Sequence, residues 1–278
     1  ALGVKIDHVA GAWPQARRNQ ADIVFEVPVG GGLTRLLAVF HSLDAPLIGP
    51  VRSARPVDAD IMGLFGQSYF AFSGGSKTDL APITSSANLT PMWWDVTPSL
   101  FVTRTDHAVP HQVFALSSTL YAGGQARKPV KTPPPAIFSY SAAAPAGATT
   151  ATSITAPYPA ATGSWSWDGS KYLRTQNGKA DTLMDGSQVT ASDVVIMSVS
   201  VQSTAARDSH GAVVPVPVMV GTGTAWVFRN GLMEKGIWSR PKTTSPMKLL
   251  TSTGQVITLA PGRTWVEVLP NSQHPVVH

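Results

Sequence analysis

The residue types best suited to chemistry lie in one short segment, residues 48–56, which reads Ile-Gly-Pro-Val-Arg-Ser-Ala-Arg-Pro. It places Arg52, Ser53 and Arg55 on a backbone stiffened by two prolines, in a chain whose charged residues make up only 13%. A guanidinium is planar, permanently charged and able to grip a carboxylate or phosphate through two parallel hydrogen bonds. The segment therefore predicts a preformed anion site, without indicating which anion.

Other basic side chains can extend this site: Arg35 on a neighbouring predicted strand, and Arg104 or His111 further along. The alternative is that the arginines are structural and lock the segment to a sheet through internal ion pairs. The carboxylates available for that role are Asp22, Glu26, Asp58 and Asp60. Because the fixed fork of an arginine serves either purpose, both interpretations stay open at this point.

The same acidic residues and His111 are the candidates for acid and base catalysis. Asp22 and Glu26 lie four residues apart in a predicted strand, so both point to one face. Two such carboxylates are the equipment of a glycosidase, although their separation in space cannot be derived from spacing alone. Asp58 and Asp60 fall in the first turn of a predicted helix, where they interact favourably with the helix dipole.

A metal or cofactor site is not predicted. His107 and His111 have the i, i+4 spacing that can hold zinc on a helix, but Pro110 interrupts a helix through both. The sequence Ser73-Gly74-Gly75-Ser76 is not a nucleophile elbow, although its glycines can let backbone amides approach a ligand. Trp165 and Trp167 share one face of a predicted strand, and they are the best candidates for an exposed sugar-binding platform.

Composition narrows the class of protein. The 278 residues can form one large domain or two ordinary ones, and either can bury a core without disulfides. Lys and Arg number 21 against 16 Asp and Glu, an excess that favours anionic partners but forms no dense basic block, so we expect no nucleic-acid binding. The absence of cysteine is compatible with an oxidising compartment. Neither a signal peptide nor a run of about eighteen apolar residues is present.

The first part of the chain, residues 1–130, is predicted to be an α+β domain with a mixed sheet. Alternating or apolar runs predict three strands that share one sheet, at residues 4–8, 22–29 and 33–40, and a further strand at residues 69–72. Helical spacing predicts three helices, at residues 57–65, 77–83 and 111–121, the last closed by Gly123-Gly124. The segment with the two arginines leads directly into the first of these helices.

Residues 131–161 are rich in Pro, Ala, Thr and Ser, and we interpret them as a linker or a clasp between domains. The remainder, residues 162–278, is predicted to be a mostly antiparallel β domain. Its strongest signals are hairpin turns between strand-like runs, at Asp168-Gly169, Asn230-Gly231 and Thr253-Gly254. The predicted fold class is therefore α+β, with a β-rich second part.

Several motifs resemble the YerB-like family of bacterial lipoproteins. They span nearly the whole chain, at residues 20–26, 31–35, 48–56, 73–76, 109–111, 172–174, 193–196 and 261–265. The chain departs from the family at Gly30, where an acidic residue is usual, and at Gln112, where Asn is favoured. If the acidic residue before the glycine pair were catalytic in the family, this chain would lack it.

The resemblance implies a two-domain, extracytoplasmic protein tethered to a membrane, with a leader and a lipid-bearing cysteine upstream of Ala1; the family brings no established activity. Three functions follow as hypotheses. The first is an envelope protein that binds an anionic wall polymer or precursor through the arginine site. The second is a hydrolase of a phosphodiester or glycosidic bond at the same site, with Glu26, Asp22 or His111 as acid or base. The third is a structural partner of wall-synthesis proteins.

Overall fold

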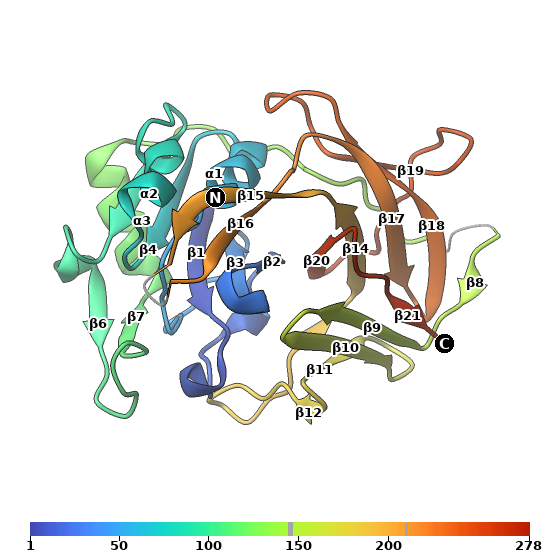
Figure 1. Cartoon of the computed structure of the whole chain (residues 1–278), viewed down its shortest axis with the longest axis horizontal. Coiled ribbons are helices and arrows are strands. Elements are labelled where there is room, and N and C mark those ends of the chain that lie inside the picture. Colours follow the sequence, from blue (N-terminus) through green and yellow to red (C-terminus); the bar gives the residue numbers. More distant parts are fainter. Residues whose placement is uncertain (144–146, 209–210) are drawn as a thin grey trace.

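The computed structural model describes residues 1–143, 147–208 and 211–278, and one large mixed sheet runs through it (Figure 1). In spatial order its strands are β19 (Lys248–Leu250), β18 (Leu232–Arg240), β17 (Gly221–Arg229), β14 (Asp193–Val199), β20 (Thr264–Pro270), β2 (Ile23–Pro28), β3 (Thr34–Phe40), β1 (Leu2–Asp7), β4 (Ser68–Phe72) and β5 (Leu89–Trp93), while β8 (Thr149–Thr150) pairs with β18. The molecule is therefore mostly β.

The strands predicted near the N-terminus do share this sheet. β3 pairs antiparallel with both β1 and β2, and β4 runs parallel to β1. All six residues of β1 and of β2 are buried, as expected for strands covered on both faces. The prediction of a single N-terminal sheet is confirmed.

The second part of the chain extends the same sheet. β20 lies between β14 and β2 and runs parallel to both, so the sheet continues from one part of the sequence into the other. β17 and β18 form the hairpin predicted at Asn230-Gly231, whose residues have φ of 53° and 71°. Asparagine and glycine are the residues that adopt positive φ most readily, and this explains the turn.

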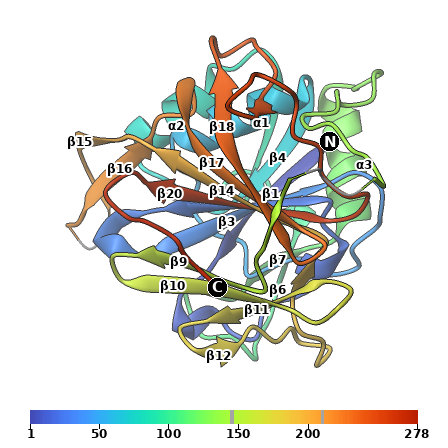
Figure 2. The same ribbon diagram turned by 90° about the vertical axis from the view of Figure 1, so that its right-hand side faces the viewer.

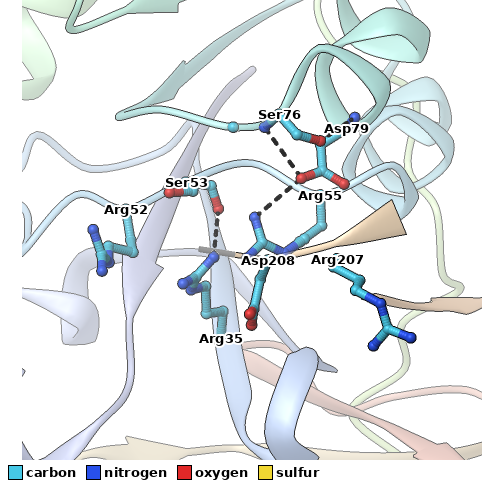
Figure 3. A pocket seen from close by; sticks show the side chains of 9 residues that line it. Arg35, Arg52, Ser53, Arg55, Ser76, Asp79, Arg207 and Asp208 are labelled. Atoms are coloured by element: carbon cyan, nitrogen blue, oxygen red, sulfur yellow. Dashed lines mark hydrogen bonds and ion pairs between the residues drawn. The ribbon is translucent and has the colours of Figure 1, made fainter. Parts of the chain in front are cut away.

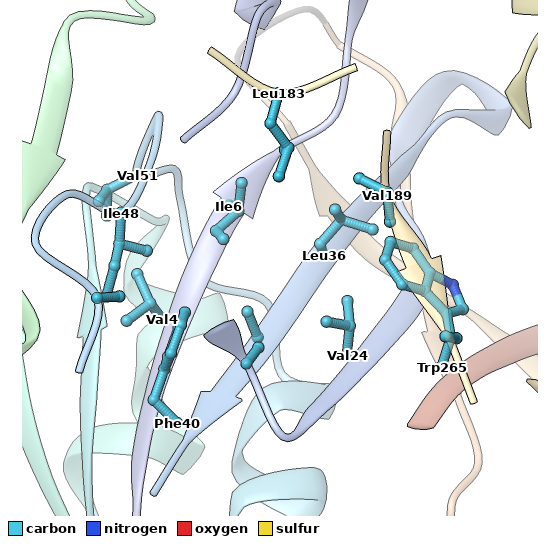
Figure 4. Packing of buried hydrophobic residues seen from close by; sticks show 14 of the residues in the cluster. Val4, Ile6, Val24, Leu36, Phe40, Ile48, Val51, Leu183, Val189 and Trp265 are labelled. Carbon is cyan, nitrogen blue, oxygen red and sulfur yellow. The ribbon is translucent and has the colours of Figure 1, made fainter. Parts of the chain in front are cut away.

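A smaller antiparallel sheet packs against one face of the large one (Figure 2). Its strands are β12 (Lys179–Ala180), β11 (Tyr172–Gln176), β10 (Ala161–Trp167), β9 (Ser153–Tyr158) and β21 (Val276–Val277), while β13 (Thr190–Ala191) pairs with β11. β10 and β11 form the hairpin predicted at Asp168-Gly169. Apolar side chains fill the space between the two sheets, and part of this core, including Val24, Leu36 and Trp265, appears in Figure 4.

Two helices cover the other face of the large sheet. α1 (Val57–Met62), continued by a 3-10 turn at Gly63–Phe65, and α2 (Lys77–Thr84) bury their apolar residues against Phe25, Leu37 and Phe70. α3 (Ser117–Arg127) contributes Leu120 to the core on the side of the smaller sheet. Two ribbons complete the described fold, β15 (Val201–Arg207) with β16 (Val213–Pro217) and β6 (Phe101–Thr103) with β7 (Val113–Ala115). Among the described residues no helix is both long and apolar enough to cross a bilayer.

Two predicted elements were wrong. Residues 111–121 are not one helix, because Val113–Ala115 pairs with β6 as β7 and the helix starts only at Ser117. This helix also continues through Gly123-Gly124, where a Cβ on Gly124 would clash with the ring of Tyr69; here glycine permits close packing and does not end the helix. The strand-like run that follows the Thr253-Gly254 turn, residues 256–259, forms no strand; it makes only single bridges, from Val256 to Leu250 and from Leu259 to Tyr140.

The segment predicted as a linker or clasp is partly packed into the fold; its residues 144–146 lie outside the described part. Ile137 and Phe138 are buried in the core beneath α1. The backbone then pairs with the C-terminal part, since Leu259 N–H donates to Ser139 O and Ser141 N–H donates to Leu259 O, each at 2.8 Å. This segment therefore contacts both parts of the sequence.

Candidate functional site

The segment predicted to carry an anion site is held in place by backbone hydrogen bonds to three strands. Arg52 N–H donates to Lys5 O of β1 at 2.8 Å, and Val51 N–H donates to Val113 O of β7 at 2.6 Å. Ser73, just after β4, donates its N–H to Arg52 O at 2.9 Å. The segment thus owes its fixed position to this pairing as well as to its prolines.

Four of the six predicted residues line one pocket of about 410 Å³ (Figure 3). They are Arg35, Arg52, Ser53 and Arg55. The remaining lining residues come from the start of α2 and from the end of β15. These are Gly75, Ser76, Asp79, Arg207 and Asp208. The pocket therefore combines four arginines with two carboxylates.

The arginines do not pair with the carboxylates named as structural partners in the sequence analysis. Arg52 Nε lies 3.0 Å from Asp7 Oδ2, and Arg55 Nη1 lies 3.5 Å from Asp79 Oδ2 and donates to Ala54 O at 2.8 Å. Asp58 accepts the backbone N–H of Arg55 at 2.7 Å, while its other oxygen lies 2.6 Å from Lys5 Nζ. The guanidiniums of Arg52 and Arg55 are thus each held by a carboxylate other than those expected.

Arg35 is a buried cation with few hydrogen-bond partners among the described residues. Its Nη1 donates to Ser53 O at 3.2 Å, and its Nε has no hydrogen-bond partner among the described residues. Burial, followed by the charge of Arg55, lowers the pKa of Arg35 to about 9, against the opposing effect of Asp7. A lowered pKa means that the protonated form is destabilised, and a bound anion would relieve this.

Sequence reasoning missed Asp7, Asp79, Arg207 and Asp208, because they come from three separate segments. Only Asp79 had a local signal: Ser76 and Asp79 form a capping box at the start of α2, as the pattern S-x-x-D suggests. A Cβ on Gly30 would clash with the Asp208 carboxylate. Where the resemblance expects an acidic residue at position 30, a carboxylate from the β15–β16 ribbon occupies the adjacent space.

Arg104 and His111 do not line the pocket. Arg104 forms a paired contact with Asp106, with Nε–Oδ1 at 2.8 Å and Nη2–Oδ2 at 2.6 Å, and lies over the ring of Phe114. His111 Nδ1 lies 2.9 Å from Asp7 Oδ2, so this histidine meets Arg52 only through a shared carboxylate. Neither residue is in place to complete the anion site directly.

A second charged cluster, the buried ion cluster, lies between the two sheets. Glu26 Oε2 accepts from Arg174 Nη2 at 2.6 Å, and Asp181 accepts from Arg174 at 2.7 Å and from Arg18 at 2.9 Å. Burial raises the pKa of Glu26, but the charges of Arg174 and His8 outweigh it, so that the pKa lies below its usual range. All these side chains are fully enclosed.

Glu267 belongs to the same cluster and was missed because its neighbour in space is far away in sequence. It lies beside Glu26 on adjacent parallel strands and accepts from Trp165 Nε1 and Tyr158 Oη, both at 3.0 Å. Burial and the negative charge of Glu26 raise the pKa of Glu267 to about 8. The buried site therefore favours the protonated form of Glu267.

These contacts change two earlier interpretations. Trp165 is 1% exposed and packs edge-on against Trp265, so the prediction that it forms an exposed platform with Trp167 was wrong. Glu26 is enclosed in the ion cluster, and Asp22 accepts the backbone N–H of His41 at 2.7 Å. The carboxylates suggested for hydrolysis thus lie outside the arginine pocket.

Comparison with known proteins identifies the family of this chain. One family model, "Protein of unknown function (DUF3048) N-terminal domain", matches residues 1–130, and "Protein of unknown function (DUF3048) C-terminal domain" matches residues 154–266. The chain belongs to the DUF3048 family. The resemblance inferred from the motifs is thereby confirmed, and no reaction comes with it.

Two comparisons extend this family assignment. The chain is 24% identical over 280 residues to the Bacillus subtilis protein described as "Putative lipoprotein YerB", covering 97% of this chain and 81% of that protein. It also resembles the crystal structure of YerB protein from Bacillus subtilis, with a TM-score of 0.84, 20% identity and coverage of 99% of this chain and 93% of the other. At this identity the structural likeness shows that the two chains share a fold.

Proposed function

We propose that the arginine pocket binds an anionic group, a phosphate or carboxylate carried by a polymer or precursor of the cell envelope. The observation that carries the proposal is the gathering of Arg35, Arg52, Arg55 and Arg207 around one cavity with only two carboxylates among its lining residues. Guanidiniums held at one edge keep their other N–H groups for a ligand, and bidentate contact is the geometry in which arginine binds phosphate and carboxylate.

The location we propose is extracytoplasmic and membrane-anchored. It rests on the relative from Bacillus subtilis that is described as a putative lipoprotein, which matches this chain over 97% of its length. An envelope location would bring the pocket close to anionic wall polymers, whose repeated charges suit a site built from several arginines.

The test is a thermal-shift titration with inorganic phosphate, pyrophosphate and fragments of wall polymer. A ligand present at a hundred times its dissociation constant stabilises a protein by about 2.7 kcal/mol. We expect such a rise for the wild type and its loss in Arg52→Ala, because this side chain lines the pocket and is only 18% exposed.

The matched control is Arg104→Ala, which removes the same charge from a residue outside the pocket. We expect this variant to retain the ligand response of the wild type. A wild type that responds to none of these anions, together with a large loss of stability in Arg52→Ala, would overturn the proposal and leave the arginines a structural role. If both variants lost the response equally, the response would depend only on the net charge of the protein. That result would count against the pocket.

A further inference from the structure

A second cavity, the apolar groove, lies next to the arginine pocket. It has a volume of about 400 Å³, which falls within the range of small-molecule sites. Its walls come from the ends of β2 and β20, the turn after β2, the β9–β10 turn and the β15–β16 ribbon. Its apolar lining includes Pro28, Pro159, Val201, Val213, Pro215 and Pro270. None of the described residues that line it is charged, and its polar side chains are two serines.

Two segments of the chain border both cavities. β15 lines the groove with Ser203 and the arginine pocket with Arg207. The turn between β2 and β3 lines the groove with Gly31, and β3 lines the pocket with Arg35. In each case the two positions are four residues apart, and four residues of extended chain span about 13 Å. One ligand molecule can therefore occupy both cavities.

Gly30 lies where the two cavities approach each other. Its neighbours Val29 and Gly31 line the groove, while a Cβ on Gly30 would clash with Asp208 of the arginine pocket. β16 packs against β2 and against this turn, and the ribbon extends from β14 toward α2 (Figure 1). The ribbon is therefore a wall common to both cavities, although they share no lining residue.

The apolar lining of the groove is open to a ligand. Val213 is 39% exposed, and Val201 is only partly buried. Removing hydrocarbon from water is favourable, and each methylene group of a ligand that becomes fully buried strengthens binding about fourfold. A groove lined by proline and valine without charged side chains thus favours a hydrocarbon chain over a polar ligand.

The arginine pocket favours a phosphate as the head group. Its guanidiniums come from three segments, with Arg35 on β3, Arg52 and Arg55 on residues 48–56, and Arg207 on β15. A phosphate monoester has three terminal oxygens arranged around its phosphorus, whereas a carboxylate has two in one plane. The phosphate can therefore accept hydrogen bonds from guanidiniums that approach from different sides.

We propose that the two cavities together bind one amphiphile, with its phosphate in the arginine pocket and its hydrocarbon chain in the apolar groove. The inference rests on the proposed anion site and names the class of its ligand, a phosphate monoester of a long-chain alcohol. A phosphate attached only to polar groups would bind through the arginines and gain nothing from the groove.

The test is a calorimetric titration of the wild type with inorganic, methyl, hexyl and decyl phosphate, each below its micelle-forming concentration. We expect affinity to rise along this series, at least tenfold from methyl to decyl phosphate, because the longer chains bury more methylene groups in the groove. 1-Hexanol has a chain but no phosphate, so we expect it to bind at least tenfold more weakly than hexyl phosphate.

Val213→Ser removes apolar surface from an exposed strand position in the groove. We expect this variant to bind decyl phosphate about fivefold more weakly than the wild type and inorganic phosphate equally well. The matched control is Val256→Ser, since Val256 is 51% exposed and lines neither cavity. Its affinity for both ligands should equal that of the wild type, whereas Arg52→Ala should lose both.

Several outcomes would overturn the proposal, and they separate it from the anion site. Equal affinity of the wild type for methyl and decyl phosphate would exclude the amphiphile and leave the anion site standing. Equal weakening of decyl phosphate binding in Val213→Ser and Val256→Ser would exclude the groove. Tight binding of decyl phosphate that Arg52→Ala retains, or that hexanol matches in the hexyl series, would show that the arginines do not hold the phosphate. Failure of every phosphate to bind would remove the anion site, and the amphiphile with it.

Discussion

The arginine pocket and the buried ion cluster lie on opposite sides of the same sheet and differ in the balance between positive and negative side chains. The pocket lies beside α2 on one face. Four arginines line it together with Asp79 and Asp208, and Asp7 pairs with Arg52. The cluster lies under the smaller sheet on the other face, where Arg18 and Arg174 are matched by Glu26 and Asp181, and burial favours the protonated form of Glu267. One region therefore has an excess of positive charge, and the other is balanced.

This difference suggests how each region is to be interpreted. Charges that leave water need partners with good geometry, and a matched set meets this need without any ligand. An excess of like charge at a cavity is unfavourable until a ligand of opposite sign binds, so it points to binding. By this criterion the ion cluster is structural, whereas the arginine pocket is a candidate binding site. The following predictions test whether the contrast holds.

The largest effect is expected from breaking the balance in the ion cluster. Arg174→Met keeps most of the side-chain volume but leaves Glu26 and Asp181 without their shared cation. Removing one partner of a buried ion pair costs about 3–5 kcal/mol. We expect a loss of this size in the free energy of unfolding, measured by urea denaturation.

Arg104→Met is the matched control for Arg174→Met. Its guanidinium pairs with Asp106 at the surface and is 32% exposed. Exposed ion pairs are screened by solvent and contribute little to stability, so we expect little change. If both variants unfolded at similar urea concentrations, the cluster would not be a structural element and the contrast with the pocket would fail.

A smaller effect on stability is expected from Glu267→Gln, which replaces the titratable carboxyl group by an amide that cannot lose a proton. An unfolded glutamate has a pKa of 4.5, and the folded value is about 8, so the folded state binds this proton more tightly. The contribution to stability is complete below pH 4.5 and is lost as the pH rises through about 8. Glu267→Gln mimics the protonated form. Its amide oxygen can accept from Trp165, and its amide N–H can donate to Tyr158 Oη when that hydroxyl donates to Glu26 O instead of to residue 267.

We therefore expect the wild type to lose about 2–4 kcal/mol more than Glu267→Gln between pH 5 and pH 9, measured as free energies of unfolding. Asp193→Asn is compared in the same experiment as a variant of another buried acid. Burial raises the pKa of Asp193 to about 7, and this residue lies outside the cluster. Parallel stability curves for the wild type and Glu267→Gln would show that Glu267 is ionised in the folded protein.

Local signals in the sequence allowed the arginine pocket to be found in part. Arg52, Ser53 and Arg55 are neighbours in the chain, and Arg35 follows a glycine-rich turn in the same sheet. The turn at Asn230 was equally local. The structure shows the turn and the grouping of these side chains because both depend on stereochemistry and spacing over a short stretch of chain.

The ion cluster could not be found in this way, because its geometry depends on strand register between distant segments. Glu26 meets Glu267 only because β20 inserts beside β2, and Arg174 reaches both from the smaller sheet. The pairing of Val113–Ala115 with β6 likewise overrode the apparent helical spacing there. Tertiary contacts of this kind leave little trace in local patterns.

The smallest effect is expected from removing a negative charge from the arginine pocket. Asp79 Oδ2 lies 3.5 Å from Arg55 Nη1 and also accepts the backbone N–H of Ser76 at 3.3 Å, so this carboxylate both caps α2 and offsets one pocket cation. Asp79→Asn keeps an oxygen that can accept from Ser76 but removes the charge. We expect affinity for phosphate, measured by calorimetry, to rise about threefold, and stability to fall by about 0.5–1 kcal/mol through the weaker cap.

The control for Asp79→Asn is Asp106→Asn, which removes the same charge beside Arg104, outside the pocket. Both variants change the net charge equally, so any general attraction for phosphate rises to the same extent in both. A gain confined to Asp79→Asn would therefore measure the field inside the pocket, where a ligand takes over the pairing that Asp79 provides to Arg55 in the free protein. Equal gains, or none, would mean that the pocket arginines are as well matched as those of the ion cluster, and the distinction between the two faces of the sheet would disappear.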